Sequence, residues 1–125
     1  MVVGLLAGRF EITDHLVGGK LVSIDQPAWN HHLEDEMNQV VGVLSAGGAK
    51  VVLFTMPYID PPQEAPDGSV YPENRNSRVD EYNRILERVA ARHPGEVTVV
   101  GPGAGRAQTG FAMLADLLTI VRRRS

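Results

Sequence analysis

The residue types best suited to chemistry in this chain are gathered just after its first apolar run. Residues 2–7 are apolar, and the next positions hold a turn glycine and four charged or titratable residues: Gly8, Arg9, Glu11, Asp14 and His15. An imidazole beside a carboxylate can serve as a general base, and a guanidinium can donate hydrogen bonds to a developing oxyanion. The cluster holds no serine, so a capped or solvated turn is the alternative for Asp14 and His15. A simple ion pair is the alternative for Arg9 and Glu11.

Strands of a parallel sheet are the elements that must position this cluster. The run at 2–7 shows no polar alternation, which is typical of a strand buried on both faces. A second such run spans 51–56, and a shorter one spans 97–100. Ligands of open parallel sheets bind beyond the carboxyl ends of the strands. We therefore expect a crevice there, lined by the cluster and by Tyr58 and Asp60, for which a loop anchor is the alternative.

Two amphipathic helices should connect these strands. Apolar residues recur at steps of three and four over 29–44 and again over 79–90. Pro27 marks the start of the first helix, because its missing N–H costs nothing there. Ser77 and Asp80 have the spacing of a capping box for the second helix.

The remaining segments are predicted as connections. Residues 16–26 should form a polar connection, and residues 57–76, which contain five prolines, should form a long loop that overhangs the crevice. The alternation of strands and helices predicts an α/β domain with helices on both faces of a small parallel sheet. The three strands identified fall below the usual four to six, so we interpret the sheet as incomplete.

Composition excludes several classes of function. The net charge of −3 argues against a general nucleic-acid binder, and the absence of cysteine excludes disulfides, thiolate catalysis and cysteine-ligated metal. No signal peptide and no run of about twenty apolar residues is apparent. The chain itself is therefore expected in the cytoplasm by default, without a membrane segment.

The character of the chain changes at residue 101. Residues 101–125 hold four arginines against one aspartate, a balance of +3 in a chain whose total is −3. The glycine-rich Gly101–Arg106 precedes a further apolar stripe and could hold a phosphate at a helix N-terminus. Arg106 stands where a dinucleotide fingerprint has glycine or alanine, so a plain turn is the favoured interpretation.

His31, His32 and Glu34 are residue types that bind metals. Adjacent helical residues point about 100° apart, since a turn has 3.6 residues, and no second pair of ligands is apparent. We therefore interpret them as solvated helix residues and expect no metal and no cofactor.

The order of several strings resembles the SGNH (GDSL-like) hydrolase superfamily, and most closely the SGNH domains attached to membrane O-acyltransferases. The strings are LLAGRFE (5–11), the helix containing Trp29, VVLFTMPYIDPP (51–62), and RVDEYNRILERVAARHP (78–94) leading to VTVV. The resemblance covers residues 1–100. It implies a flavodoxin-like three-layer α/β/α fold and serine-based ester hydrolysis or acyl transfer.

The chain departs from the family at the catalytic blocks. It contains no Gly-Asp-Ser, and residues 67–69 hold these types in another order. Where the family has Gly-x-Asn-Asp, residues 8–11 place Phe10 at the oxyanion asparagine and Glu11 at the aspartate. The family's Asp-x-x-His is absent, and no histidine follows His93. No catalytic residue is therefore assigned, and Gly8, Arg9, Glu11, Asp14, His15 and Tyr58 are kept as oxyanion or substrate-crevice candidates.

We interpret residues 1–100 as a partial SGNH-like domain and residues 101–125 as a divergent end, from a shifted reading frame or a wrongly assigned gene. The expected function is a truncated esterase or O-acyltransferase domain that is inactive alone. By the resemblance, intact relatives act on acylated envelope carbohydrates or small esters, at the cell envelope. The alternatives are a non-catalytic binding module, using residues 8–11 and the proline-rich loop, and a phosphate or nucleotide binder through Gly101–Arg106. An unpaired sheet edge favours a homo-oligomer.

Overall fold

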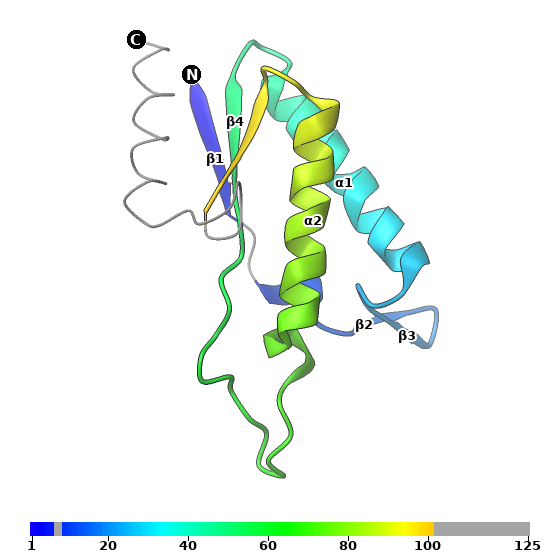
Figure 1. The fold of residues 1–125 in the computed structure, drawn as a ribbon. Helices are drawn as coiled ribbons and strands as arrows, with labels where there is room; N and C mark the ends of the chain where they lie inside the picture. Colours follow the sequence, from blue (N-terminus) through cyan, green and yellow to red (C-terminus); the bar gives the residue numbers. More distant parts are fainter. Residues whose placement is uncertain (7–8, 102–125) are drawn as a thin grey trace.

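A computed structural model describes residues 1–6 and 9–101 of the chain (Figure 1). Strands and helices alternate through this part of the chain, except that β2 and β3 are consecutive strands. In order the elements are β1 (Val2–Leu6), the 3₁₀ helix η1 (Arg9–Ile12), β2 (His15–Val17), β3 (Lys20–Val22), α1 (Pro27–Ser45), β4 (Lys50–Phe54), the 3₁₀ helix η2 (Pro72–Asn74), α2 (Asn76–Arg92) and β5 (Val97–Val100).

The three apolar runs form one parallel sheet in the order β1-β4-β5. The central strand β4 pairs with β1 through Val51 opposite Val3, and with β5 through Val51 opposite Val97. Side chains alternate between the faces of a strand, yet Val51, Val52 and Leu53 are all buried. The prediction of a strand buried on both faces is therefore confirmed for β4. It is wrong for β1, an edge strand of the described sheet, where Val2, Val3 and Leu5 are half-buried and Gly4 is exposed.

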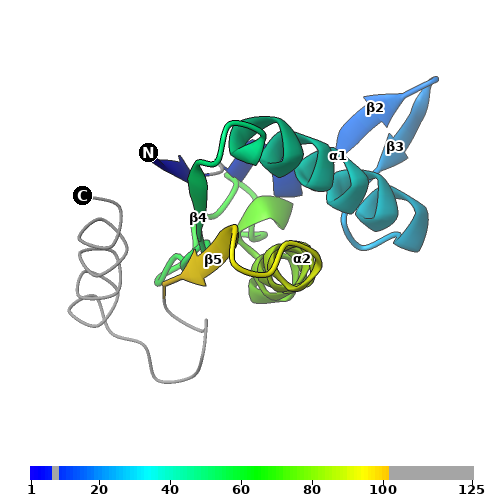
Figure 2. The ribbon, with the colours of Figure 1, turned by 90° about the horizontal axis from the view of Figure 1, so that it is seen from above.

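Both α-helices lie on the same face of this sheet (Figure 2). The further apolar stripe predicted after Arg106 lies outside the described residues, so helices on both faces stay a prediction. The placement of α1 and α2 has a topological reason: β1 to β4 and β4 to β5 are steps in the same direction across the sheet. Two crossovers of the same hand that step in the same direction place their helices on one face. The described architecture is thus a short parallel sheet with one layer of helices.

The core lies between the sheet and these helices. The apolar stripe of α2 is buried as the periodicity predicted, with Val79, Ile85 and Val89 fully inaccessible to solvent. The stripe of α1 contributes less, because only Val41 among its apolar residues is fully buried. Neither α-helix is long and apolar enough to cross a bilayer, within the part of the chain that is described.

Two local expectations are wrong. The polar connection at 16–26 contains the hairpin of β2 and β3, with Leu16 opposite Leu21, and the hairpin projects from the body of the molecule (Figure 1). The helix α2 begins at Asn76, so Ser77 and Asp80 form no capping box, and the residue at the cap is Arg75.

Candidate functional site

Arg9 connects the carboxyl edge of the sheet to the long loop at 57–76. This residue begins η1, directly after the segment that leaves β1. Its guanidinium donates to the carbonyl oxygen of Pro57 and, at 3.1 Å, to that of Glu73. Burial lowers the pKa of Arg9, against the opposing effect of the Glu73 charge. Arg9 thus ties the two ends of the loop to η1, and it donates to backbone oxygens rather than to Glu11.

Asp14 is held by a buried arginine. The Arg78 side chain is 5% exposed and lies at the start of α2. Its nitrogens donate at 2.8 Å to Asp14 Oδ1, to Asp25 Oδ2 and to the carbonyl oxygen of Ile12. The Asp14 carboxylate is therefore engaged by Arg78. We call these four residues the Arg78 cluster.

His15 lies in a row of aromatic rings. Its ring centroid is 4.8 Å from that of Phe10, edge to face, and 5.1 Å from that of Trp29. The His32 ring continues the row at 4.8 Å from Trp29. His15 Nε2 is buried with no hydrogen-bond partner. Nowhere in residues 1–6 and 9–101 does a serine hydroxyl hydrogen-bond to a histidine, so these residues form no nucleophile–base pair.

Tyr58 lies just beyond β4, on the loop. Its hydroxyl donates to Asp80 of α2, and this hydrogen bond is the main cause of a raised Tyr58 pKa, with burial second. The same end of β4 is fixed by Asn83, whose side chain accepts from the Met56 N–H at 2.7 Å and donates to its carbonyl at 2.9 Å. Tyr58 also lines a hollow of about 530 Å³ between the loop and the start of α2.

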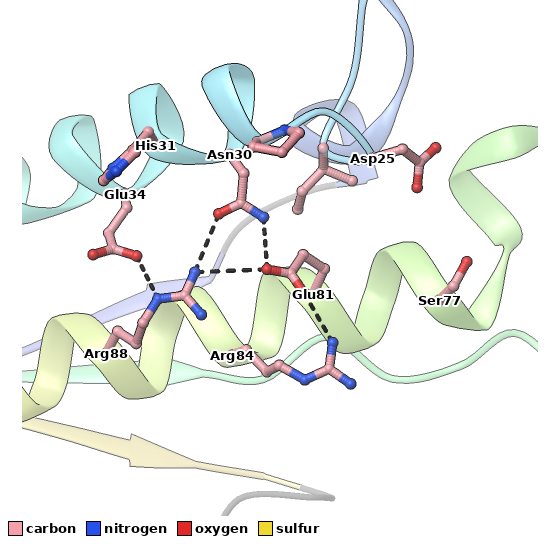
Figure 3. A pocket seen from close by; sticks show the side chains of 10 residues that line it. Asp25, Asn30, His31, Glu34, Ser77, Glu81, Arg84 and Arg88 are labelled. Carbon is pink, nitrogen blue, oxygen red and sulfur yellow. Dashed lines mark hydrogen bonds and ion pairs between the residues drawn. The ribbon is translucent and has the colours of Figure 1, made fainter.

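A second hollow, of about 680 Å³, is a groove between α1 and α2 (Figure 3). Glu34 accepts from Arg88 Nε at 2.5 Å, and Asn30 bridges Arg88 and Glu81. Burial alone would raise the pKa of Glu81, but hydrogen bonds from Asn30 and Arg84 outweigh it and lower that pKa. These side chains are hydrogen-bonded to one another, and together they form a network that connects α1 to α2.

The other predicted positions are distributed as follows. His31 lines the groove between the helices, whereas His32 pairs with Glu36 at 3.0 Å. The described residues include no group of three potential metal ligands. Gly8 and the stretch from 102 to 106 lie outside the described residues, so the phosphate hypothesis stays a prediction.

Sequence patterns missed Arg78 and Asn83, because a polar residue on an amphipathic helix carries no sign of a distant partner.

Comparisons of the chain with protein-family models, with curated proteins and with solved structures find no match.

Proposed function

We propose that residues 1–100 form a truncated SGNH-type esterase or O-acyltransferase domain, roughly the middle of an intact one, and that this chain lacks hydrolytic activity by itself. The observation that carries the proposal is the strand order β1-β4-β5 with both connecting helices on one face. A flavodoxin-like sheet has the order 2-1-3-4-5, in which the last three strands follow one another in the same way. The strings quoted for the SGNH family fall on these elements in the family's order.

The substrate in the complete domain would be an acylated carbohydrate or small ester, bound beyond the carboxyl ends of the strands. Arg9, Phe10 and Glu11 occupy that edge in η1. Phe10 is 72% exposed and offers an apolar surface rather than an oxyanion donor. Loss of one such donor typically costs about 10²–10³ in rate. With no serine–histidine pair among the described residues, attack on an acyl carbon needs groups from outside them.

Two experiments test this proposal. The purified chain is assayed on a chromogenic acetyl ester beside its His15→Ala variant, and both should hydrolyse the ester no faster than buffer. Sequencing of the flanking DNA should find a Gly-Asp-Ser codon block upstream and an Asp-x-x-His block in another frame downstream. Turnover that His15→Ala abolishes would contradict the lack of activity, and flanks without either block would contradict the SGNH origin.

The hollow beside Tyr58 supports a second candidate function, a non-catalytic binding module. The hollow is formed by the proline-rich loop at the end of β4, where ligands of parallel sheets bind. A ligand of this site raises thermal stability by mass action. A thermal-shift screen of acetylated sugars and nucleotides, with Tyr58→Ala as the matched variant, distinguishes this module, since only binding at the hollow is lost in the variant.

A further inference from the structure

A cavity of about 220 Å³ lies between β1, η1, α1 and α2, separate from the hollows described above. Most of its lining is apolar: Leu5, Leu33, Met37, Val40 and Ile85. Ile85 is fully buried at the inner end, while Val40 is 42% exposed and the Glu36 side chain is 60% exposed. The cavity therefore has a largely apolar interior, and its lining along α1 is exposed to solvent. We call it the Glu11–Tyr82 cavity, after its two inner polar residues.

Two of the residues that line this cavity each have a buried polar atom without a partner. Tyr82 is 2% exposed, and its hydroxyl makes no hydrogen bond to any described residue. Glu11 Oε2 is likewise buried without a partner, and the two groups do not hydrogen-bond to each other. Buried polar groups are nearly always paired, because an unpaired group has lost its hydrogen bonds to water. Two such atoms on residues that line one cavity indicate that something supplies their hydrogen bonds.

The charged residues that line the cavity indicate which class of ligand it binds. Glu11 and Glu36 both line it, and none of its described lining residues is a lysine or arginine. Glu36 is largely exposed and pairs with His32, so Glu11 is the carboxylate of this cavity whose buried oxygen lacks a partner. Burial, with the Glu11 charge second, raises the Tyr82 pKa, so the phenol stays neutral near pH 7. A cation is favoured beside a carboxylate that is uncompensated and partly desolvated, as Glu11 is here. An apolar cavity of about 150 Å³ holds benzene, so this one has room for a ring and a short arm.

We propose that the Glu11–Tyr82 cavity binds a small primary amine with an apolar body. The ammonium donates to Glu11 Oε2 and to the Tyr82 hydroxyl oxygen, and the apolar body contacts Leu33, Met37 and Ile85. This assignment does not depend on the proposed SGNH function, because the cavity lies between the sheet and the helices and uses no nucleophile.

The probes are benzylamine, benzyl alcohol and benzoate, which share a ring and differ in charge. Each is titrated into the full chain and followed by NMR shifts of the Met37 methyl and the Ile85 methyls. Benzylamine should bind roughly tenfold or more tightly than benzyl alcohol, since a charge-assisted hydrogen bond exceeds a neutral one by about that factor. Benzoate should not bind.

Matched variants assign the polar contacts. Glu11→Gln should weaken benzylamine roughly tenfold or more and leave benzyl alcohol unchanged. Tyr82→Phe, which keeps the ring and the fold, should weaken both ligands. Glu87→Gln, an exposed residue of α2, should change neither. Equal binding of benzylamine and benzoate, insensitivity to both cavity variants, or a folded protein that holds only water in this cavity would overturn the proposal.

Discussion

Replacement of Arg78 by methionine tests whether the Arg78 cluster holds the carboxyl edge of the sheet against α2. Methionine keeps the length of the apolar stem, so the change removes chiefly the guanidinium. Three hydrogen bonds of 2.8 Å disappear, two of them to carboxylates. The carbonyl oxygen of Ile12 loses its charged donor, which costs about 1–3 kcal/mol if the oxygen stays unpaired.

The exposure of the Asp14 and Asp25 carboxylates determines how much the free energy of unfolding falls in the Arg78→Met variant. Removal of one partner from a fully buried pair costs about 3–5 kcal/mol. The Asp14 and Asp25 side chains are 39% and 47% exposed, so water recovers part of that loss. We expect Arg78→Met to lower the free energy of unfolding by about 3 kcal/mol, or the Tm by roughly 12 °C for a domain of this size.

Urea denaturation followed by far-ultraviolet circular dichroism measures this loss as a change in midpoint at constant slope. The matched control is Arg84→Met on the same helix, whose side chain is 59% exposed and pairs with Glu81. It should cost less than about 1 kcal/mol. In a double-mutant cycle with Asp25→Asn, the double variant should lose less stability than the sum of the single variants. Equal losses for Arg78→Met and Arg84→Met would refute the reasoning.

Two further predictions concern the ends of strands. Gly101 has φ +131°, and a Cβ there would lie 2.1 Å from Thr55 Oγ1; Gly101→Ala should therefore cost about 2 kcal/mol or more in urea denaturation, whereas Gly47→Ala, in open space, should change stability by less than about 1 kcal/mol. Asp80→Asn should lower the raised pKa of Tyr58 toward that of free tyrosine, as seen by NMR titration of the ring. The Asp80 hydrogen bond stabilises the protonated phenol, so its contribution to stability is complete below the ordinary tyrosine pKa and lost as pH rises through the raised one. An unchanged Tyr58 titration in the variant, or equal effects of the two alanines, would contradict these accounts.

Local chemistry determined the elements themselves. The apolar runs became β1, β4 and β5, and the stripe from Val79 to Val89 became the buried face of α2. Each follows from side-chain periodicity, which is a property of neighbouring residues. Pro27 began α1 for an equally local reason, because its ring fixes φ and its missing N–H is not needed in the first turn.

Only the tertiary structure determined which residues far apart in the sequence interact. No local pattern places Arg78 against Asp14 and Asp25, which lie 64 and 53 residues away, or directs Asp80 to Tyr58 instead of a helix cap. The placement of both helices on one face depends on the direction in which the chain crosses the sheet. The unpaired atoms of Glu11 and Tyr82 depend on where β1, η1, α1 and α2 leave a gap. Hydrogen bonds and cavities between distant segments arise only when the whole chain packs, whereas helical and strand periodicity is already present in a few consecutive residues.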